Sequence, residues 1–222
     1  MSDVTISVRG QHETRLQPER AVAHLTIRAE GPERGAVVQR MAAFTAPVRD
    51  DLIARKEAGT VEEWTSQRVS VWSERPWNPN GKRLAPVHYA SVAVTATFTD
   101  FAALSWWATE VAEREGVQLR WIDWQLTPET RVAVERDTAA EAVQVAVARA
   151  TAYASALGLT TVSPAQIADV GLLAQESVTA LQAPRMARAA YATGDGADAP
   201  TVSLQPEDIV VSAAVEAQFT AR

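Results

Sequence analysis

Few side chains in this 222-residue sequence are placed for catalysis. The three histidines, His12, His24 and His88, lie far apart, and none stands beside a second histidine at the spacing of a metal site. His12 precedes Glu13 directly, so the two side chains would diverge in an extended strand. The absence of cysteine excludes thiolate ligands, cysteine nucleophiles and disulfides. We therefore predict no metal site and no catalysis by histidine or cysteine.

The motifs of the common enzyme classes are also missing. The sequence contains no glycine-rich phosphate loop, no G-x-S-x-G nucleophile and no H-E-x-x-H zinc helix. Carboxylate pairs such as Glu62-Glu63 and Glu207-Asp208 lie at the boundaries of predicted elements, where capping and solvation are commoner roles than acid–base catalysis. The sequence thus predicts a protein that is not an enzyme, with no catalytic residues and no cofactor.

Seven tryptophans form the unusual feature of the composition, because the sequence has only three tyrosines and four phenylalanines. Tryptophan fills cores, anchors interfaces and stacks on flat ligands. Three interpretations therefore stay open, namely core packing, an oligomer interface and a platform for a small molecule. The tryptophans are Trp64, Trp72, Trp77, Trp106, Trp107, Trp121 and Trp124.

Three aromatic residues are candidates for an exposed patch. Strand alternation places Trp72 on the face opposite the neighbouring valines, and Trp77 falls in a predicted hairpin loop. Together with Tyr89 they could contact a partner subunit or a ligand. Arg68 or Arg75 would then bind a polar group of that ligand, so these five residues are the predicted ligand or interface site.

The surrounding elements follow from hydrophobic periodicity, which predicts an α+β fold. Residues 21–126 have the element order βαββαβ, the ferredoxin-like unit, in which both helices cover one face of an antiparallel sheet. An N-terminal strand, a long third helix and C-terminal strands extend this unit. The predicted strands are 4–9, 21–29, 64–74, 87–99, 117–126, 167–173 and 209–219, and the predicted helices are 33–58, 100–116 and 127–158.

Three details of this arrangement are further predictions. The first strand is expected to pair with the second as a hairpin. Pro47 is expected to kink or split the first helix, because it removes a backbone hydrogen bond. Strand 117–126 is apolar on both faces and is therefore expected to be covered on both sides.

The predicted helix 127–158 is the longest element of the chain. Thr127 is a favourable N-cap, Pro128 suits the first helical position and Gly158 ends the helix. Its predicted buried stripe is rich in small residues, so we expect it to pack closely on a sheet that contains strand 209–219. The stripe consists of Ala139, Val143, Ala146, Ala150, Tyr153 and Leu157.

Composition bounds the remaining possibilities. A hydrophobic content of 47% is ample for a core, and a net charge of −6 opposes nucleic-acid binding. No apolar run has the roughly 18 residues of a membrane-spanning helix, and no secretory signal begins the given sequence, so a cytoplasmic location without membrane insertion is predicted. We predict one domain over residues 1–222, with a division into two lobes left open. The Ala/Gly/Asp-rich segment 179–201 is predicted to be a mobile loop.

Three motifs resemble those of SIMPL-domain proteins, and the likeness spans nearly the whole chain. ISVRG followed by QPERAVAHLTIRAEG is similar to the family's opening strands. AVARATAYASALGL resembles its helical segment, and LQPEDIVVSAAVEAQF resembles its final strand. The sequence departs from the family by having His12 in place of the second glycine of the opening G-x-G, and no signal peptide is expected from the residues given.

The resemblance implies assembly or protein binding more than chemistry. The family has no established catalytic residues to transfer to this sequence. Bacterial relatives are often exported, at least one forms a large ring, and links to stress tolerance have been suggested. We therefore expect a homo-oligomer or a protein-binding partner, with small-molecule binding as the alternative.

Overall fold

The computed structural model describes residues 3–77, 79, 84–173 and 204–222. The chain divides into two compact units, each described here by itself. Unit 1 is formed from the described parts of Met1–Leu16, Thr127–Asp195 and Asp208–Arg222, and unit 2 from those of Gln17–Leu126 and Gly196–Glu207. The segment 179–201, predicted to be a mobile loop, lies outside the described residues.

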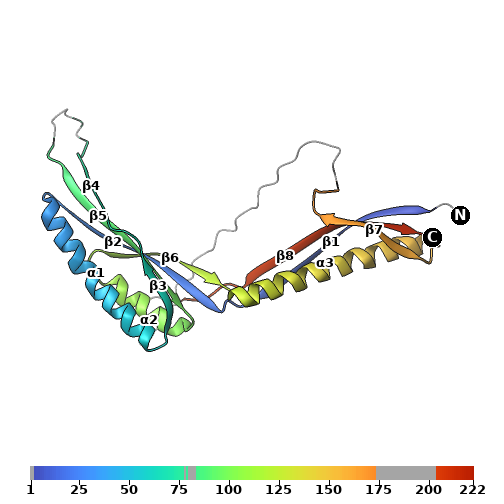
Figure 1. Ribbon diagram of the computed structural model, residues 1–222, viewed down its shortest axis with the longest axis horizontal. Helices are drawn as coiled ribbons and strands as arrows, with labels where there is room; N and C mark the ends of the chain where they lie inside the picture. Colours follow the sequence, from blue (N-terminus) through green and yellow to red (C-terminus); the bar gives the residue numbers. More distant parts are fainter. Residues whose placement is uncertain (1–2, 78, 80–83, 174–203) are drawn as a thin grey trace. The chain divides into compact units, whose positions relative to one another are not determined.

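Unit 2 contains an antiparallel sheet with the strand order β3-β5-β2-β6 (Figure 1). This is the ferredoxin-like order predicted for residues 21–126, because the two central strands are the first and third of the βαββαβ unit. The predicted strand 64–74 is divided into β3 and β4, which both pair with β5. The strands are β2 (Arg20–Gly31), β3 (Val61–Ser66), β4 (Ser70–Glu74), β5 (Val87–Phe98) and β6 (Val117–Gln125).

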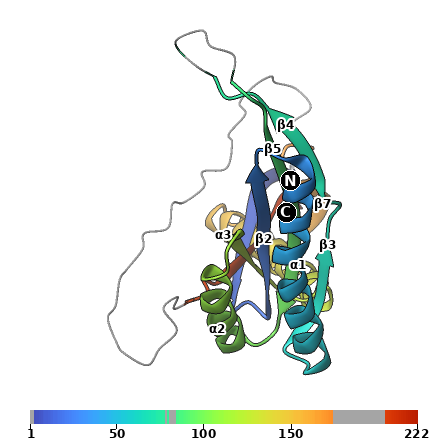
Figure 2. The ribbon, with the colours of Figure 1, turned by 90° about the vertical axis from the view of Figure 1, so that its left-hand side faces the viewer.

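Two helices, α1 (Arg34–Glu57) and α2 (Phe101–Ala112), pack on one face of this sheet, as predicted (Figure 2). Asp100 caps α2 by accepting hydrogen bonds from the backbone N–H groups of Ala102 and Ala103. Pro47 does not split α1, which continues to Glu57. The core between helices and sheet includes Leu25, Ile27, Val37, Leu52, Val94, Phe98, Leu104 and Trp107.

A half-buried carboxylate joins the two helices of unit 2. Asp51 of α1 accepts a hydrogen bond from Trp107 Nε1 of α2 at 2.8 Å, and a further one from Arg55 Nε at 3.0 Å. Arg114 Nη2 lies 3.4 Å from the same carboxylate. Because the indole N–H of buried Trp107 would otherwise lack an acceptor, Asp51 permits this tryptophan to fill the core.

The prediction that β6 is covered on both faces is wrong. The register of β6 on β2 shifts between His24 and Leu25, which is a β-bulge. A bulge adds one residue and so reverses the alternation of faces on its two sides. The apolar residues before and after it therefore all lie toward the helices, while Trp121 is turned outward and is 57% exposed.

Unit 1 contains a three-stranded antiparallel sheet with the order β1-β8-β7. β1 (Val4–Leu16) pairs with β8 (Ile209–Ala221) over its whole length, so the predicted hairpin of the first and second strands is wrong. Alternation identified both strands but could not identify the partner, since it contains no information on pairing. β7 covers Val162–Asp169, earlier than the predicted 167–173.

Helix α3 (Pro128–Ala156) covers this sheet, and the predicted packing on strand 209–219 is confirmed. Thr127 caps α3 by accepting from the Thr130 backbone N–H. Its buried residues are spaced four apart and are all small: Thr138, Ala142, Ala146, Ala150 and Ala154.

The predicted stripe on α3 is therefore only partly correct. Ala146 and Ala150 are buried as predicted and Val143 is half-buried, but Ala139, Tyr153 and Leu157 are exposed. The prediction followed the larger apolar residues, Val143, Tyr153 and Leu157, which lie on a neighbouring face of the helix. The row spaced four apart is buried instead because its alanines permit close approach of β1.

Gly10 of β1 is a point of close approach between the sheet and α3. A Cβ at this position would collide with the carbonyl oxygen of Ala142 and lie 2.9 Å from Ala146 Cβ. We predict that Gly10→Ala destabilises the protein by about 2–3 kcal/mol, because the neighbours are backbone and a short side chain that cannot rotate away. Denaturant unfolding measures the effect.

Gly35→Ala is the matched control, since a Cβ there meets no atom within 4 Å and alanine favours a helix. Equal stability of Gly10→Ala and the unsubstituted protein would contradict the close packing described above.

Candidate functional site

The sheet face of unit 2 that α1 and α2 do not cover carries ordered rows of side chains. Register places Trp72, Tyr89 and Glu30 side by side on β4, β5 and β2. The next row contains Ser70, Ser91 and Arg28. Directly opposite side chains on antiparallel strands lie within contact distance, so the side chains of each row can interact with one another.

Trp72 and Tyr89 stack at one corner of this face. Their ring centroids are 5.5 Å apart and the ring planes differ by 20°. Trp72 is 39% exposed, so the prediction that it lies on the less buried sheet face is confirmed. The pair borders a depression of about 490 Å³, whose lining residues are Arg28, Ala29, Glu30, Trp72, Glu74, Tyr89 and Ala90. We call this depression the aromatic corner.

The structure brings together only part of the predicted ligand site. Trp77 is exposed and Arg68 follows β3, and neither is among the residues that line the aromatic corner. Arg75 Nη1 instead donates to the carbonyl oxygen of Leu84 at 3.0 Å, which ties the two arms of the β4–β5 connection. The charged residues at the corner are therefore Arg28, Glu30 and Glu74.

Sequence reasoning missed Arg28 and Glu30, although the signal was present. Both alternate with buried Ala29 on β2 and so had to lie on the uncovered face. Their position beside Tyr89 depends on the register of β2 and β5, which the sequence does not supply.

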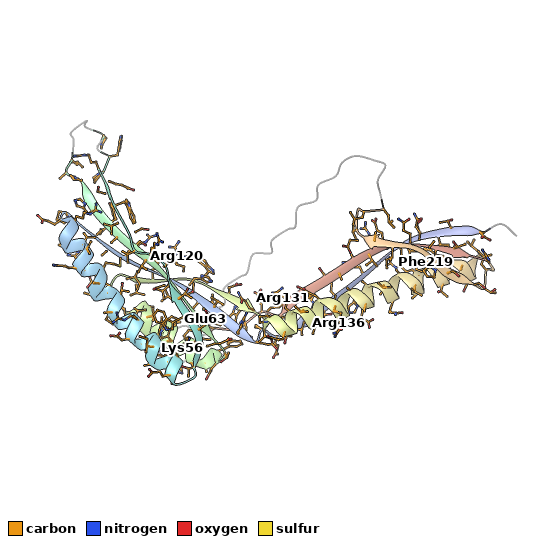
Figure 3. All side chains as sticks on the ribbon, viewed as in Figure 1. Lys56, Glu63, Arg120, Arg131, Arg136 and Phe219 are labelled. Atoms are coloured by element: carbon orange, nitrogen blue, oxygen red, sulfur yellow. The ribbon has the colours of Figure 1, made fainter. Side chains whose placement is uncertain are left out.

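A second aromatic pair lies on the same face, between β2 and β6. His24 stacks on Trp121 with ring centroids 4.5 Å apart and an interplanar angle of 18°. Arg120 precedes Trp121 on β6 and is labelled in Figure 3. It donates from Nη1 to Gln118 Oε1 at 2.9 Å. Two rows separate the aromatic pairs, Arg28 with Ser91 and Thr26 with Ala93, so the uncovered face is polar and aromatic without a continuous apolar surface.

Unit 1 carries an apolar groove between α3 and β7. α3 packs mainly over β1 and β8 and leaves the inner face of β7 uncovered. Val147 and Ile167 are 38% and 53% exposed there. Phe219 lies at the base, between the sheet and α3 (Figure 3). The groove holds about 480 Å³ and is lined by Val143, Val147, Thr151, Val162, Pro164, Ala165, Gln166, Ile167, Ala217 and Phe219.

The opposite face of the unit 1 sheet carries an ion pair. Arg9 of β1 and Glu216 of β8 are direct cross-strand neighbours, with 3.0 Å between Arg9 Nη2 and Glu216 Oε1. Glu216 Oε2 also accepts from the Gly171 backbone N–H at 3.2 Å. The hydrogen bond from Arg9, followed by that from Gly171, lowers the pKa of the Glu216 carboxyl below its usual value.

The described residues contain no group of three or more His, Asp or Glu side chains that could hold a metal ion. One comparison identifies the family. The model of the family described as "SIMPL: Protein of unknown function (DUF541)" matches residues 6–219, which is most of the chain. The chain belongs to the SIMPL family. The match includes parts of both units.

Comparison of this SIMPL protein with curated proteins found no match. Within the described ranges, none of its helices is long and apolar enough to span a membrane. The cytoplasmic location stays a prediction.

The Arg9–Glu216 pair makes a pH-dependent contribution to stability. Because the folded-state pKa of Glu216 is lowered, its stabilisation is present above the unfolded-state pKa and is lost as the pH falls through the folded-state value. We predict that Glu216→Gln lowers the thermal midpoint at pH 7, and that the difference from the unsubstituted protein decreases as the pH falls past the ordinary carboxyl pKa of 4.5 and vanishes below the lowered folded-state pKa of Glu216. Thermal unfolding from pH 7 to pH 3 measures it.

Glu13→Gln is the control for this prediction. It removes a carboxyl from the same face of β1 that forms no ion pair within the described part of the chain. A difference between Glu216→Gln and the unsubstituted protein that stays constant with pH would refute the assigned role of the carboxylate.

Proposed function

We propose that this SIMPL-family chain is a non-enzymatic protein that acts by self-assembly or protein binding through the apolar groove of unit 1. The observation that carries the proposal is the groove itself, where Val147 and Ile167 keep a large exposed fraction beside a formed core. Contiguous exposed apolar surface is costly in water and commonly marks an interaction site. A role in stress tolerance, implied by the family resemblance, is part of this proposal.

Side-chain packing is the favoured mode of association at this groove, ahead of strand addition. β7 is an edge strand, and an unprotected edge can pair with a further strand. However, Pro164 lacks a backbone N–H, and the register of β7 shifts between Pro164 and Gln166. Proline and bulges both hinder strand addition, so a partner would contact the apolar side chains of the groove.

A second copy of the chain is the first partner to consider. Two copies related by a twofold axis present the same groove to each other, so each can cover the apolar residues of the other. Such an isologous contact requires no further component. A different protein that covers the same residues is the alternative form of the proposal.

We predict that the protein is oligomeric at tens of micromolar and that the double substitution Val147→Glu, Ile167→Glu shifts it toward the 24.0 kDa monomer. Two carboxylates buried in an apolar interface would weaken association by roughly 100-fold or more. Light scattering coupled to size-exclusion chromatography measures the molar mass. Both residues are exposed in the single chain, so the variant keeps its core.

The control is Val132→Glu, at an exposed position of α3 outside the groove. It should leave the molar mass unchanged. An unsubstituted protein that stays monomeric at these concentrations would reject self-assembly, and an equal effect of Val132→Glu would place the interface elsewhere.

A second candidate function, small-molecule binding, is supported by the aromatic corner of unit 2. The stacked Trp72–Tyr89 pair borders a depression that also contains charged side chains, the combination that orients a ligand on a flat apolar surface.

A further inference from the structure

The aromatic corner has an electrostatic character that indicates the class of its ligand. Glu30 and Glu74 carry two negative charges at the depression, and Arg28 carries one positive charge. A second arginine, Arg40, donates from Nη1 to the backbone carbonyl of Glu30 at 2.7 Å and is not among the lining residues. The corner is therefore net negative, as is the whole chain, and attracts cations.

The hydrogen bond of the Trp72 indole also favours a cation as the ligand. Trp72 Nε1 donates to Glu74 Oε1 at 3.0 Å, so the indole N–H is already occupied and its π-face remains as the contact surface. Aromatic faces attract cations through the ring quadrupole. Glu30 follows Tyr89 in the same cross-strand row, which places a carboxylate next to the stacked rings.

Arg28 is positively charged and therefore requires a hydrogen-bond acceptor on the ligand. It lies one row away from Glu30 on the same strand face, opposite Ser91. No ion pair joins Arg28 to a carboxylate within the described part of the chain. Its guanidinium is thus placed to donate to an oxygen acceptor that is part of the same ligand.

We propose that the aromatic corner binds an organic cation, an ammonium or guanidinium group, that carries an oxygen acceptor a few bonds away. A lysine or arginine side chain with its peptide carbonyl satisfies both requirements, and so does the free amino acid. The cation contacts the Trp72 and Tyr89 rings and the Glu30 carboxylate, while Arg28 binds the acceptor. This inference rests on the second function proposed above and is independent of assembly through unit 1.

The experiment is a titration of the full chain followed by two-dimensional NMR, with Nα-acetyl-L-lysine amide as the probe. We expect saturable shifts, including that of the Trp72 indole N–H, with binding that weakens as salt is added. Acetylation of the probe's side-chain amine removes the charge and should weaken binding at least about tenfold. Pentylamine, a monocation that has the ammonium group without the carbonyl, should bind more weakly than the probe.

Two variants locate the site, and the thermal midpoint of each confirms folding. Glu30→Gln, an exposed conservative change, and Trp72→Ala should each weaken binding about tenfold or more. Trp106→Ala removes an exposed tryptophan of α2 that does not line the corner and should leave binding unchanged.

Three results would overturn the proposal. They are no saturable shift at millimolar probe, equal binding of the acetylated and unacetylated probes, and unchanged binding in both Glu30→Gln and Trp72→Ala. Equal binding of pentylamine would remove the role assigned to Arg28. A basic tripeptide that binds more tightly than the free amino acid indicates a protein ligand, and the reverse order indicates a metabolite. Light scattering on the same samples separates these outcomes from a failure of self-assembly.

Discussion

Unit 1 depends on the pairing of the first and last strands of the chain. β1 and β8 form a ladder without irregularity from Val4–Ala221 to Leu16–Ile209, and this ladder provides the surface on which α3 packs. The close approach at Gly10 and the small residues of α3 allow one helix to cover two strands. One helix cannot cover the third strand as well, because a helix is about 10 Å wide and strands are spaced about 4.8 Å apart. β7 is therefore left largely uncovered. The groove is thus a direct result of covering three strands with one helix.

The sequence was sufficient to predict the ferredoxin-like order of unit 2, although the predicted strand 64–74 is two strands, because periodicity indicates the type of most elements. It was insufficient wherever the answer depended on contacts between distant segments. The partner of β1 is such a case, and so is the bulge that turns Trp121 outward. The buried face of α3 is a third case, since several faces of an alanine-rich helix are equally apolar and only the neighbouring glycine of β1 selects one of them.

For the candidate sites too, the sequence predicts what depends on local pattern and not what depends on contacts between distant segments. Trp72 and Tyr89 could be recognised as candidates for an aromatic patch from composition and alternation, and the structure stacks them, with Trp72 exposed and Tyr89 half-buried. The register of β2 and β5 places Arg28 and Glu30 beside these aromatic residues. Arg75 does not line the aromatic corner, and its side chain instead donates to the Leu84 carbonyl. The groove of unit 1 could not be found at all, because each of its residues has an ordinary place in the sequence pattern. Its exposure becomes visible only when the width of α3 is compared with the sheet beneath it.

The β1–β8 ladder also determines the order in which the chain can fold during synthesis. The ribosome releases the Gln17–Leu126 part of unit 2 before α3 and β8 exist, so this part can collapse first from contacts of modest sequence separation. β1 must wait for the last residues of the chain before it acquires its neighbour. During that interval its apolar alternation is available to other chains, and any chaperone that assists this protein would be needed at its amino-terminal strand.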